Sequence, residues 1–85
     1  MTWSLIITNP ATRDLRKVPR PDVEHINATF EEMRADPYDG DIKFLKGTNR
    51  TLRRRVGDWR ILFEVYPDRQ LVVILAVGRR NSNTY

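Results

Sequence analysis

The amino-acid sequence predicts an α+β fold: an N-terminal strand, a two-helix hairpin and then an antiparallel β meander, with both helices on one face of the sheet. Two observations support this prediction. Apolar residues recur at helical spacing only before residue 36, and from residue 42 onward they follow strand-like runs broken by glycine and proline. Since 85 residues are enough for one domain and no second, we expect residues 1–85 to form a single domain.

The first part of the chain predicts one strand and two helices. Residues 3–8 form the strand, with its larger apolar side chains at alternate positions. Asn9 then caps a short helix over residues 10–18, which begins at a proline, a residue favoured at the first helical position. Asp22 caps a second helix that ends at about Ala35, before Asp36-Pro37. The apolar residues of this helix form one stripe that faces the sheet: Val23, Ile26, Phe30 and Met33.

Four further strands are expected, at residues 42–45, 52–56, 59–66 and 71–78. Gly57-Asp58 is typical of a two-residue hairpin turn, and directly paired residues share a sheet face. The face under the helices then holds Val56, Trp59, Ile61, Phe63 and Val65. The opposite face, which we name the arginine face, holds Arg53, Arg55, Arg60 and Leu62. The same register directs Arg54 toward the helices, where we expect it to snorkel at the sheet edge.

The direction of the last strand's side chains depends on the turn near residues 67–69. A three-residue turn would direct alternate residues into the core, and Arg80 onto the arginine face. The core residues would then be Leu71, Val73, Leu75 and Val77. A four-residue turn would place Arg79 on the arginine face instead. We expect the three-residue turn because it buries the larger side chains, although a β-bulge would reverse the pattern.

Composition excludes several classes of protein. Cysteine is absent, which excludes disulfides and thiolate metal sites and fits a cytoplasmic location. The one histidine, His25, excludes any site that needs two, and we expect it on the exposed side of its helix. The longest apolar run, residues 71–77, is far shorter than the roughly 20 residues of a membrane span, and the N-terminus lacks a signal-peptide pattern.

The charge is divided unevenly along the chain. Residues 1–42 hold five basic and eight acidic residues, whereas residues 43–85 hold ten and three. The predicted register also places Arg55 opposite Arg60, and like charges directly opposite each other are destabilising. We therefore favour a preformed anion site, because guanidinium groups donate paired hydrogen bonds to phosphate. The alternative is a solvated face on which arginine stems cover apolar surface.

Three segments resemble the RelE/ParE toxin superfamily: FLKG at residues 44–47, LRRRVGDWRILFEV at residues 52–65 and VVILAVGRR at residues 72–80. The superfamily has a Leu-Lys-Gly turn, a hairpin of the form Arg-x-Arg-Val-Gly-Asp-aromatic-Arg, and a hydrophobic strand that ends in Gly-x-Arg. The predicted order of elements fits along the whole chain, although its first third matches only in pattern. These motifs are specific for the superfamily and separate its branches less well.

The RelE branch, which we favour, implies a toxin of a toxin–antitoxin pair that cleaves mRNA on the ribosome and so inhibits translation. In that branch the 2′-hydroxyl attacks the adjacent phosphate without a metal or other cofactor, which leaves a cyclic phosphate and a free 5′-hydroxyl. Matched positions imply the catalytic residues Arg60, Arg80, Tyr85 and Arg53. We assign RNA binding to Arg55, Lys46, Arg79 and Lys43.

Some positions depart from the pattern. Relatives often have lysine at the positions of Thr51 and Arg53 and histidine at the position of Arg79. Arginine is a poor general base because it stays protonated. Glu64, Lys46 and Tyr85 therefore remain the alternatives for the base, and for Glu64 we favour a salt bridge at the strand edge.

Two other functions stay open: a ParE-like DNA gyrase inhibitor without nuclease activity, and an inactive or purely binding relative. Both toxin functions imply a cognate antitoxin in a hetero-oligomeric complex, with operator DNA bound only through the antitoxin. No membrane contact is implied, and the expected location is the cytoplasm.

Overall fold

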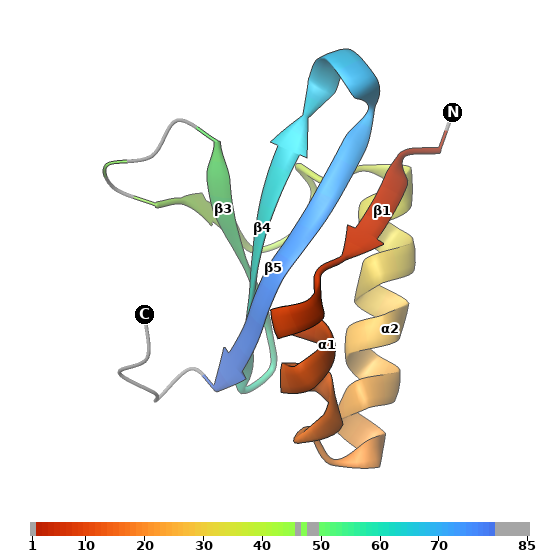
Figure 1. Ribbon diagram of the computed structural model, residues 1–85, viewed down its shortest axis with the longest axis vertical. Helices are drawn as coiled ribbons and strands as arrows, with labels where there is room; N and C mark the ends of the chain where they lie inside the picture. The colour runs from red at the N-terminus through yellow and green to blue at the C-terminus, as the bar shows by residue number, and fades with distance from the viewer. Residues whose placement is uncertain (1, 46, 48–49, 80–85) are drawn as a thin grey trace.

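The structure, a computed structural model, describes residues 2–45, 47 and 50–79. Its elements are β1 (Ser4–Ile7), α1 (Asn9–Arg16), α2 (Arg20–Ala35), β2 (Ile42–Phe44), β3 (Thr51–Val56), β4 (Trp59–Tyr66), η1 (Pro67–Arg69) and β5 (Leu71–Arg79). The strands form one five-stranded sheet in the order β1-β5-β4-β3-β2. Both helices lie on the same side of this sheet (Figure 1). The predicted α+β architecture is therefore confirmed, and none of the helices among the described residues is long and apolar enough to span a membrane.

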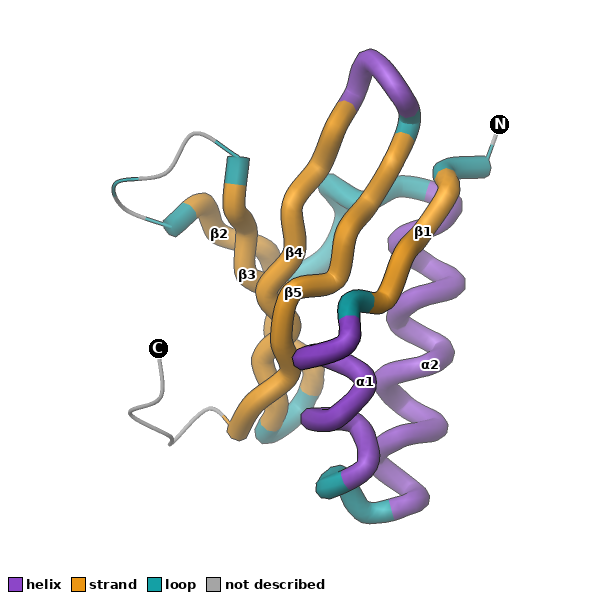
Figure 2. The backbone as a smooth tube through the Cα atoms, in the orientation of Figure 1, coloured by secondary structure: helices purple, strands orange, loops and turns teal. Residues whose placement is uncertain are grey.

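The sheet is mixed and not wholly antiparallel as we expected, because β1 pairs in parallel with β5, from Ser4 opposite Leu71 to Ile7 opposite Ile74. The helical hairpin that follows β1 lies on one side of the sheet (Figure 2), as a connection between parallel strands requires. Beyond the end of β1, the carboxylate of Asp14 in α1 accepts a hydrogen bond of 2.9 Å from the backbone N–H of Val77. Where β5 extends past its pairing with β1, a side chain of α1 thus binds the backbone of β5 in place of a strand.

Both helix starts differ from the sequence prediction. Thr8, not Asn9, is the N-cap of α1, and its Oγ1 accepts a 3.4 Å hydrogen bond from the Ala11 N–H while its hydroxyl donates to the Ile74 carbonyl at 2.8 Å. The second helix starts at Arg20, two residues earlier than its predicted cap. Asp22 lies inside the first turn and its carboxylate accepts from Trp59 Nε1 at 3.0 Å. Thr8 is therefore a local cap that also binds β5, whereas Asp22 binds a ring of the sheet and caps no helix.

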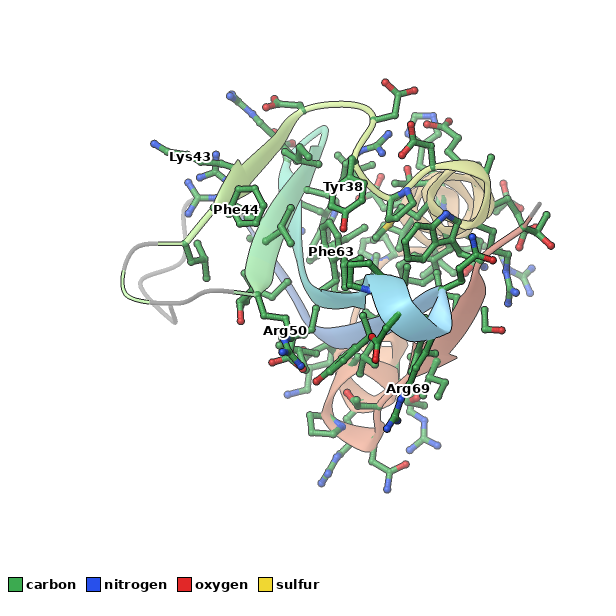
Figure 3. All side chains as sticks on the ribbon, turned by 90° about the horizontal axis from the view of Figure 1, so that it is seen from above. Tyr38, Lys43, Phe44, Arg50, Phe63 and Arg69 are labelled. Carbon is green, nitrogen blue, oxygen red and sulfur yellow. The ribbon has the colours of Figure 1, made fainter. Side chains whose placement is uncertain are left out.

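The core lies between α2 and the central strands. The predicted stripe of α2 is confirmed, since Ile26, Phe30 and Met33 are buried and Val23 packs against them. From the sheet, the buried apolar residues are Leu52, Trp59, Ile61, Phe63, Val65, Val72, Ile74 and Val77. Phe63 lies in the interior, whereas Lys43 and Phe44 lie on the strand that projects from the body (Figure 3). One face of β3, β4 and β5 is thus covered by helices.

The predicted direction of β5 is wrong over most of its length. The turn has four residues, because Tyr66 pairs with Leu71 and Gln70 adopts a left-handed conformation with φ 48°. Val72 and Ile74 are therefore buried, and not Leu71, Val73 and Leu75. The register then shifts, since Phe63 pairs with Ile74 but Leu62 pairs with Ala76, and this bulge returns Val77 to the core.

Arg54 faces the helices as predicted, but it does not snorkel. Its side chain is buried, with one guanidinium nitrogen 2.8 Å from Glu32 Oε1 and the other donating to the Asp39 carbonyl at 2.9 Å. Gly40, which has φ +89°, leaves room for this guanidinium, because a Cβ on Gly40 would overlap it. Arg54 therefore joins β3 to α2 and to the loop between α2 and β2.

Candidate functional site

The hairpin of β3 and β4 forms the centre of the candidate site, in the predicted register. Gly57 in the turn has φ 56°, a conformation that favours glycine, and Val56 pairs with Trp59. Arg55 is directly opposite Arg60, and Arg53 is opposite Leu62. The arginine face therefore exists as predicted, on the side of the sheet that α1 and α2 leave uncovered (Figure 1).

A neighbouring strand extends this face. Lys43 on β2 pairs with Arg53, and so it joins the same face. Figure 3 shows Lys43 extending outward from the projecting strand. On the other side, Arg60 pairs with Gly78 of β5, which adds no side chain over the strand. The structure thus brings together four of the predicted residues, Lys43, Arg53, Arg55 and Arg60.

The guanidinium groups of this face have unused hydrogen-bond donors. Arg55 approaches Asp41 Oδ2 at 3.9 Å, and both side chains are substantially exposed, so the pair is weak. The Nε of Arg53 is buried and has no hydrogen-bond partner among the described residues. Among the residues that the structure describes, none forms an ion pair or a side-chain hydrogen bond with the guanidinium of Arg60. An anion that approaches this face would therefore meet guanidinium groups without having to break strong contacts.

Arg79 lies apart from the arginine face. Because of the bulge, it pairs with Trp59 of the helix-covered face, and its guanidinium carbon is 4.6 Å from the centroid of the Trp59 ring. The structure has the four-residue turn, which on its own would have placed Arg79 on the arginine face, but the bulge directs Arg79 to the opposite face. Three predicted residues, Lys46, Arg80 and Tyr85, lie outside the described residues, and their assignments stay predictions.

A second group on the same face contains Glu64, one of the predicted candidates for the base, and two residues that were not predicted, Tyr66 and Arg50. The hydroxyl of Tyr66 donates a 2.9 Å hydrogen bond to Glu64 Oε1, and the guanidinium carbon of Arg50 is 4.5 Å from the Tyr66 ring centroid. Within the described ranges no ion pair holds Glu64, so our expected salt bridge stays a prediction. Strand parity could have revealed Tyr66, because residues 60, 62, 64 and 66 alternate along one strand. His25 is exposed on α2, as expected.

This arrangement is suited to stabilising negative charge. Fixed donors aimed at an anion contribute most where charge develops during a reaction, since they need no rearrangement. Two arginines opposite each other, with a third beside them, fit the several oxygens of one phosphate. The geometry of this site is therefore suited to a phosphate or a similar anion.

Solved structures show the same fold. A chain of the archaeal RelE–RelB complex from Pyrococcus horikoshii has a TM-score of 0.82 and 22% identity, with coverage of 95% of this chain and 98% of that one. A chain of the RelB–RelE antitoxin–toxin complex from Methanococcus jannaschii has a TM-score of 0.75 and 27% identity, with coverage of 88% and 89%. The fold and the basic face together define a toxin of the RelE type.

The sequence comparisons identify the family. The model of the ParE toxin of type II toxin-antitoxin system, parDE, matches residues 5–84, so this chain belongs to that family and to the RelE/ParE superfamily. A protein from Methanocaldococcus jannaschii with the provisional name toxin RelE1 is 26% identical over 85 residues, which cover 96% of this chain and 94% of the relative. The resemblance inferred from the hairpin motif is confirmed.

Proposed function

We propose that this toxin is a ribosome-dependent mRNA endonuclease, and that it inhibits translation by cutting mRNA. The observation that supports this function is the pairing of Arg55 with Arg60 on an uncovered sheet face, with Arg53 beside them. Like charges opposite each other weaken a sheet by about 0.2–1 kcal/mol. A bound phosphate would offset that cost and make the arrangement useful.

The proposed reaction needs only the RNA and protein side chains. The 2′-oxygen of one nucleotide forms a bond to the adjacent phosphorus, and the bond from phosphorus to the 5′-oxygen breaks. The 2′-proton passes to a base and the 5′-oxygen receives a proton, so the products are a 2′,3′-cyclic phosphate and a 5′-hydroxyl. Arg60 and Arg53 stabilise the extra negative charge on the phosphorane more than the charge on the starting phosphate.

Six further residues complete this proposal. By their match to the family motif, Arg80 is proposed to stabilise the same negative charge, and Tyr85 is proposed to donate the proton to the leaving 5′-oxygen. Arg55 and Lys43 bind the phosphates on either side, as their places on the arginine face allow. Lys46 and Arg79 are proposed as outer RNA contacts, with Arg79 restrained by its stack on Trp59.

A cognate antitoxin is the proposed protein partner. The solved relatives were crystallised as toxin–antitoxin complexes of RelE with RelB. The excess of basic residues after residue 42 favours a partner segment with acidic residues, because opposite charge accelerates association. The complex is hetero-oligomeric and contacts operator DNA through the antitoxin. A ribosomal target implies the cytoplasm, which is the location that we propose.

The test is induction of the chain in bacteria without the antitoxin, followed by mapping of mRNA 5′ ends. Wild type should cut within translated codons. Arg60→Ala should reduce cutting by about 10²–10³-fold, the usual effect of removing one donor to a developing anion. Arg69→Ala is the matched control, since Arg69 is an exposed arginine in η1. Unchanged cutting by a folded Arg60→Ala variant would refute the assignment.

The second candidate is inhibition of DNA gyrase, favoured by the name of the matched family, the ParE toxin. Purified toxin would then block supercoiling by gyrase and leave translation in vitro intact. In that case Arg60→Ala need not change toxicity. A chain that arrests growth in neither way would be the inactive relative considered above.

A further inference from the structure

The arginine face continues along β4 to a group with different chemistry. Beyond Leu62, this strand directs Glu64 and Tyr66 to the same face. Glu64 lies between Thr51 on β3 and Val73 on β5, and it is half-buried. It is the one carboxylate that β3, β4 and β5 direct to this face, where the other charged residues of these strands are arginines. A negative carboxylate there lowers the electrostatic attraction of this face for phosphate, which indicates that Glu64 has a specific role.

Glu64 is too far from Arg60 to act on the same phosphate. The two residues are four positions apart on one strand, which corresponds to about 13 Å at the usual rise of about 3.3 Å per residue. That distance is several times the roughly 3.4 Å rise between stacked nucleotides of one strand. A nucleotide that contacts Glu64 therefore lies further along the RNA than the one whose phosphate contacts Arg60.

The carboxylate of Glu64 is held in place by its neighbours. Tyr66 donates to Oε1 at 2.9 Å, and Arg50 stacks on the Tyr66 ring at 4.5 Å, which restrains the ring in turn. No side-chain donor among the described residues occupies Oε2. A carboxylate accepts hydrogen bonds at about four positions on its two oxygens. One fixed bond thus orients the group and leaves acceptors for a ligand.

The acceptors of Glu64 match one base better than the others. Unpaired RNA bases are recognised by hydrogen bonds to their Watson–Crick edges. Guanine presents two adjacent donors there, N1–H and the N2 amino group, and these can bond to both oxygens of one carboxylate. Uracil presents a single N–H between two carbonyl oxygens, and a negatively charged carboxylate repels both of these oxygens.

We propose that Glu64, oriented by Tyr66, binds the Watson–Crick edge of an unpaired guanine in the RNA that the arginine face holds. This inference rests on the proposed function, because it assumes that RNA lies along β4. It names a base preference that neither the arginines nor the family motif supplies. Arg50 and Tyr66 act as positioning residues for the carboxylate.

The first measurement is binding of short single-stranded RNAs, labelled at one end, that differ only by guanine or uracil at one central position. Wild type should bind the guanine RNA at least about fivefold more tightly, the lower end for a bidentate base contact. Glu64→Gln retains an oxygen for the Tyr66 hydroxyl but replaces one acceptor by a donor, so the ratio should fall to about one. Tyr66→Phe should lower the ratio by a smaller factor.

The second measurement is the mapping of cut sites in translated mRNA. Among the cuts that Glu64→Gln still makes, the enrichment of guanine near the cut should be lost. Glu24→Gln is the matched control, because Glu24 is exposed on α2, on the other side of the sheet. An equal guanine preference in wild type and Glu64→Gln, or none in wild type, would overturn the inference.

The two measurements separate the two proposals. If wild type cuts no mRNA, the proposed nuclease function fails, and the binding ratio still decides the role of Glu64. If wild type cuts mRNA but Glu64→Gln keeps the same distribution of cut sites, the guanine contact fails and the nuclease function stands.

Discussion

The buried arginine next to the site, Arg54, should contribute more stability through a backbone carbonyl than through its ion pair. Its side chain is 10% exposed, whereas that of its partner Glu32 is 65% exposed. An ion pair with so exposed a carboxylate contributes about 0.2–1 kcal/mol. The hydrogen bond from the charged guanidinium to the Asp39 carbonyl contributes about 1.5–3 kcal/mol. Arg54→Ala should therefore lower the free energy of unfolding by about 2–4 kcal/mol, and Glu32→Ala by less than about 1 kcal/mol.

Urea unfolding followed by tryptophan fluorescence measures these differences, with an unchanged m value as the check that both variants unfold in two states. The double variant gives the coupling energy of the pair, which should stay below about 1 kcal/mol. Arg54→Met keeps most of the apolar stem and so separates lost packing from lost hydrogen bonds. If Glu32→Ala is as destabilising as Arg54→Ala, the ion pair dominates and the reasoning from exposure is wrong.

Two further results are expected. Arg55→Thr should reduce the slope of log affinity for single-stranded RNA against log salt by about 0.7, the effect of one lost phosphate contact, as fluorescence anisotropy at several salt concentrations would show. Its free energy of unfolding should rise by about 0.2–1 kcal/mol, because the like-charge pair with Arg60 is removed. An unchanged slope would mean that Arg55 binds no phosphate. Asp22→Ala leaves the Nε1 donor of buried Trp59 without its partner and should cost about 1–3 kcal/mol in urea unfolding. A cost near zero would indicate that water replaces the carboxylate.

Local patterns were sufficient to predict the arrangement of the β3–β4 hairpin. A two-residue turn fixes the register of the strands that it joins, and one register assigns every side chain to a face. The position of Arg55 opposite Arg60 followed from Gly57-Asp58 alone, and the structure agrees. The same reasoning identified the buried stripe of α2, since helical spacing is equally local.

Features that depend on distant partners were missed. The bulge between Ile74 and Ala76 cannot be recognised from the sequence of an all-apolar strand, because every side chain there could be buried in the core. The Arg54 pair joins residues 22 positions apart, and Asp22 binds a ring 37 positions away. The parallel pairing of β1 was missed for the same reason, since nothing in residues 4–7 indicates which strand they join.

The parallel pairing of β1 with β5 also determines the order in which the protein can assemble. The bond from the Thr8 hydroxyl to the Ile74 carbonyl spans 66 positions, so the ribosome must release β5 before the first strand has a neighbour. Contacts of such long range slow folding, because the chain entropy is lost before the contact is gained. Until β5 is made, β1 has no strand to pair with, and β4, which bears Arg60, lacks its neighbour β5. The arginine face lies on the β3–β4 hairpin, so its residues can pair before β5 is made, but the sheet that carries them is completed only when β5 joins β4 and β1.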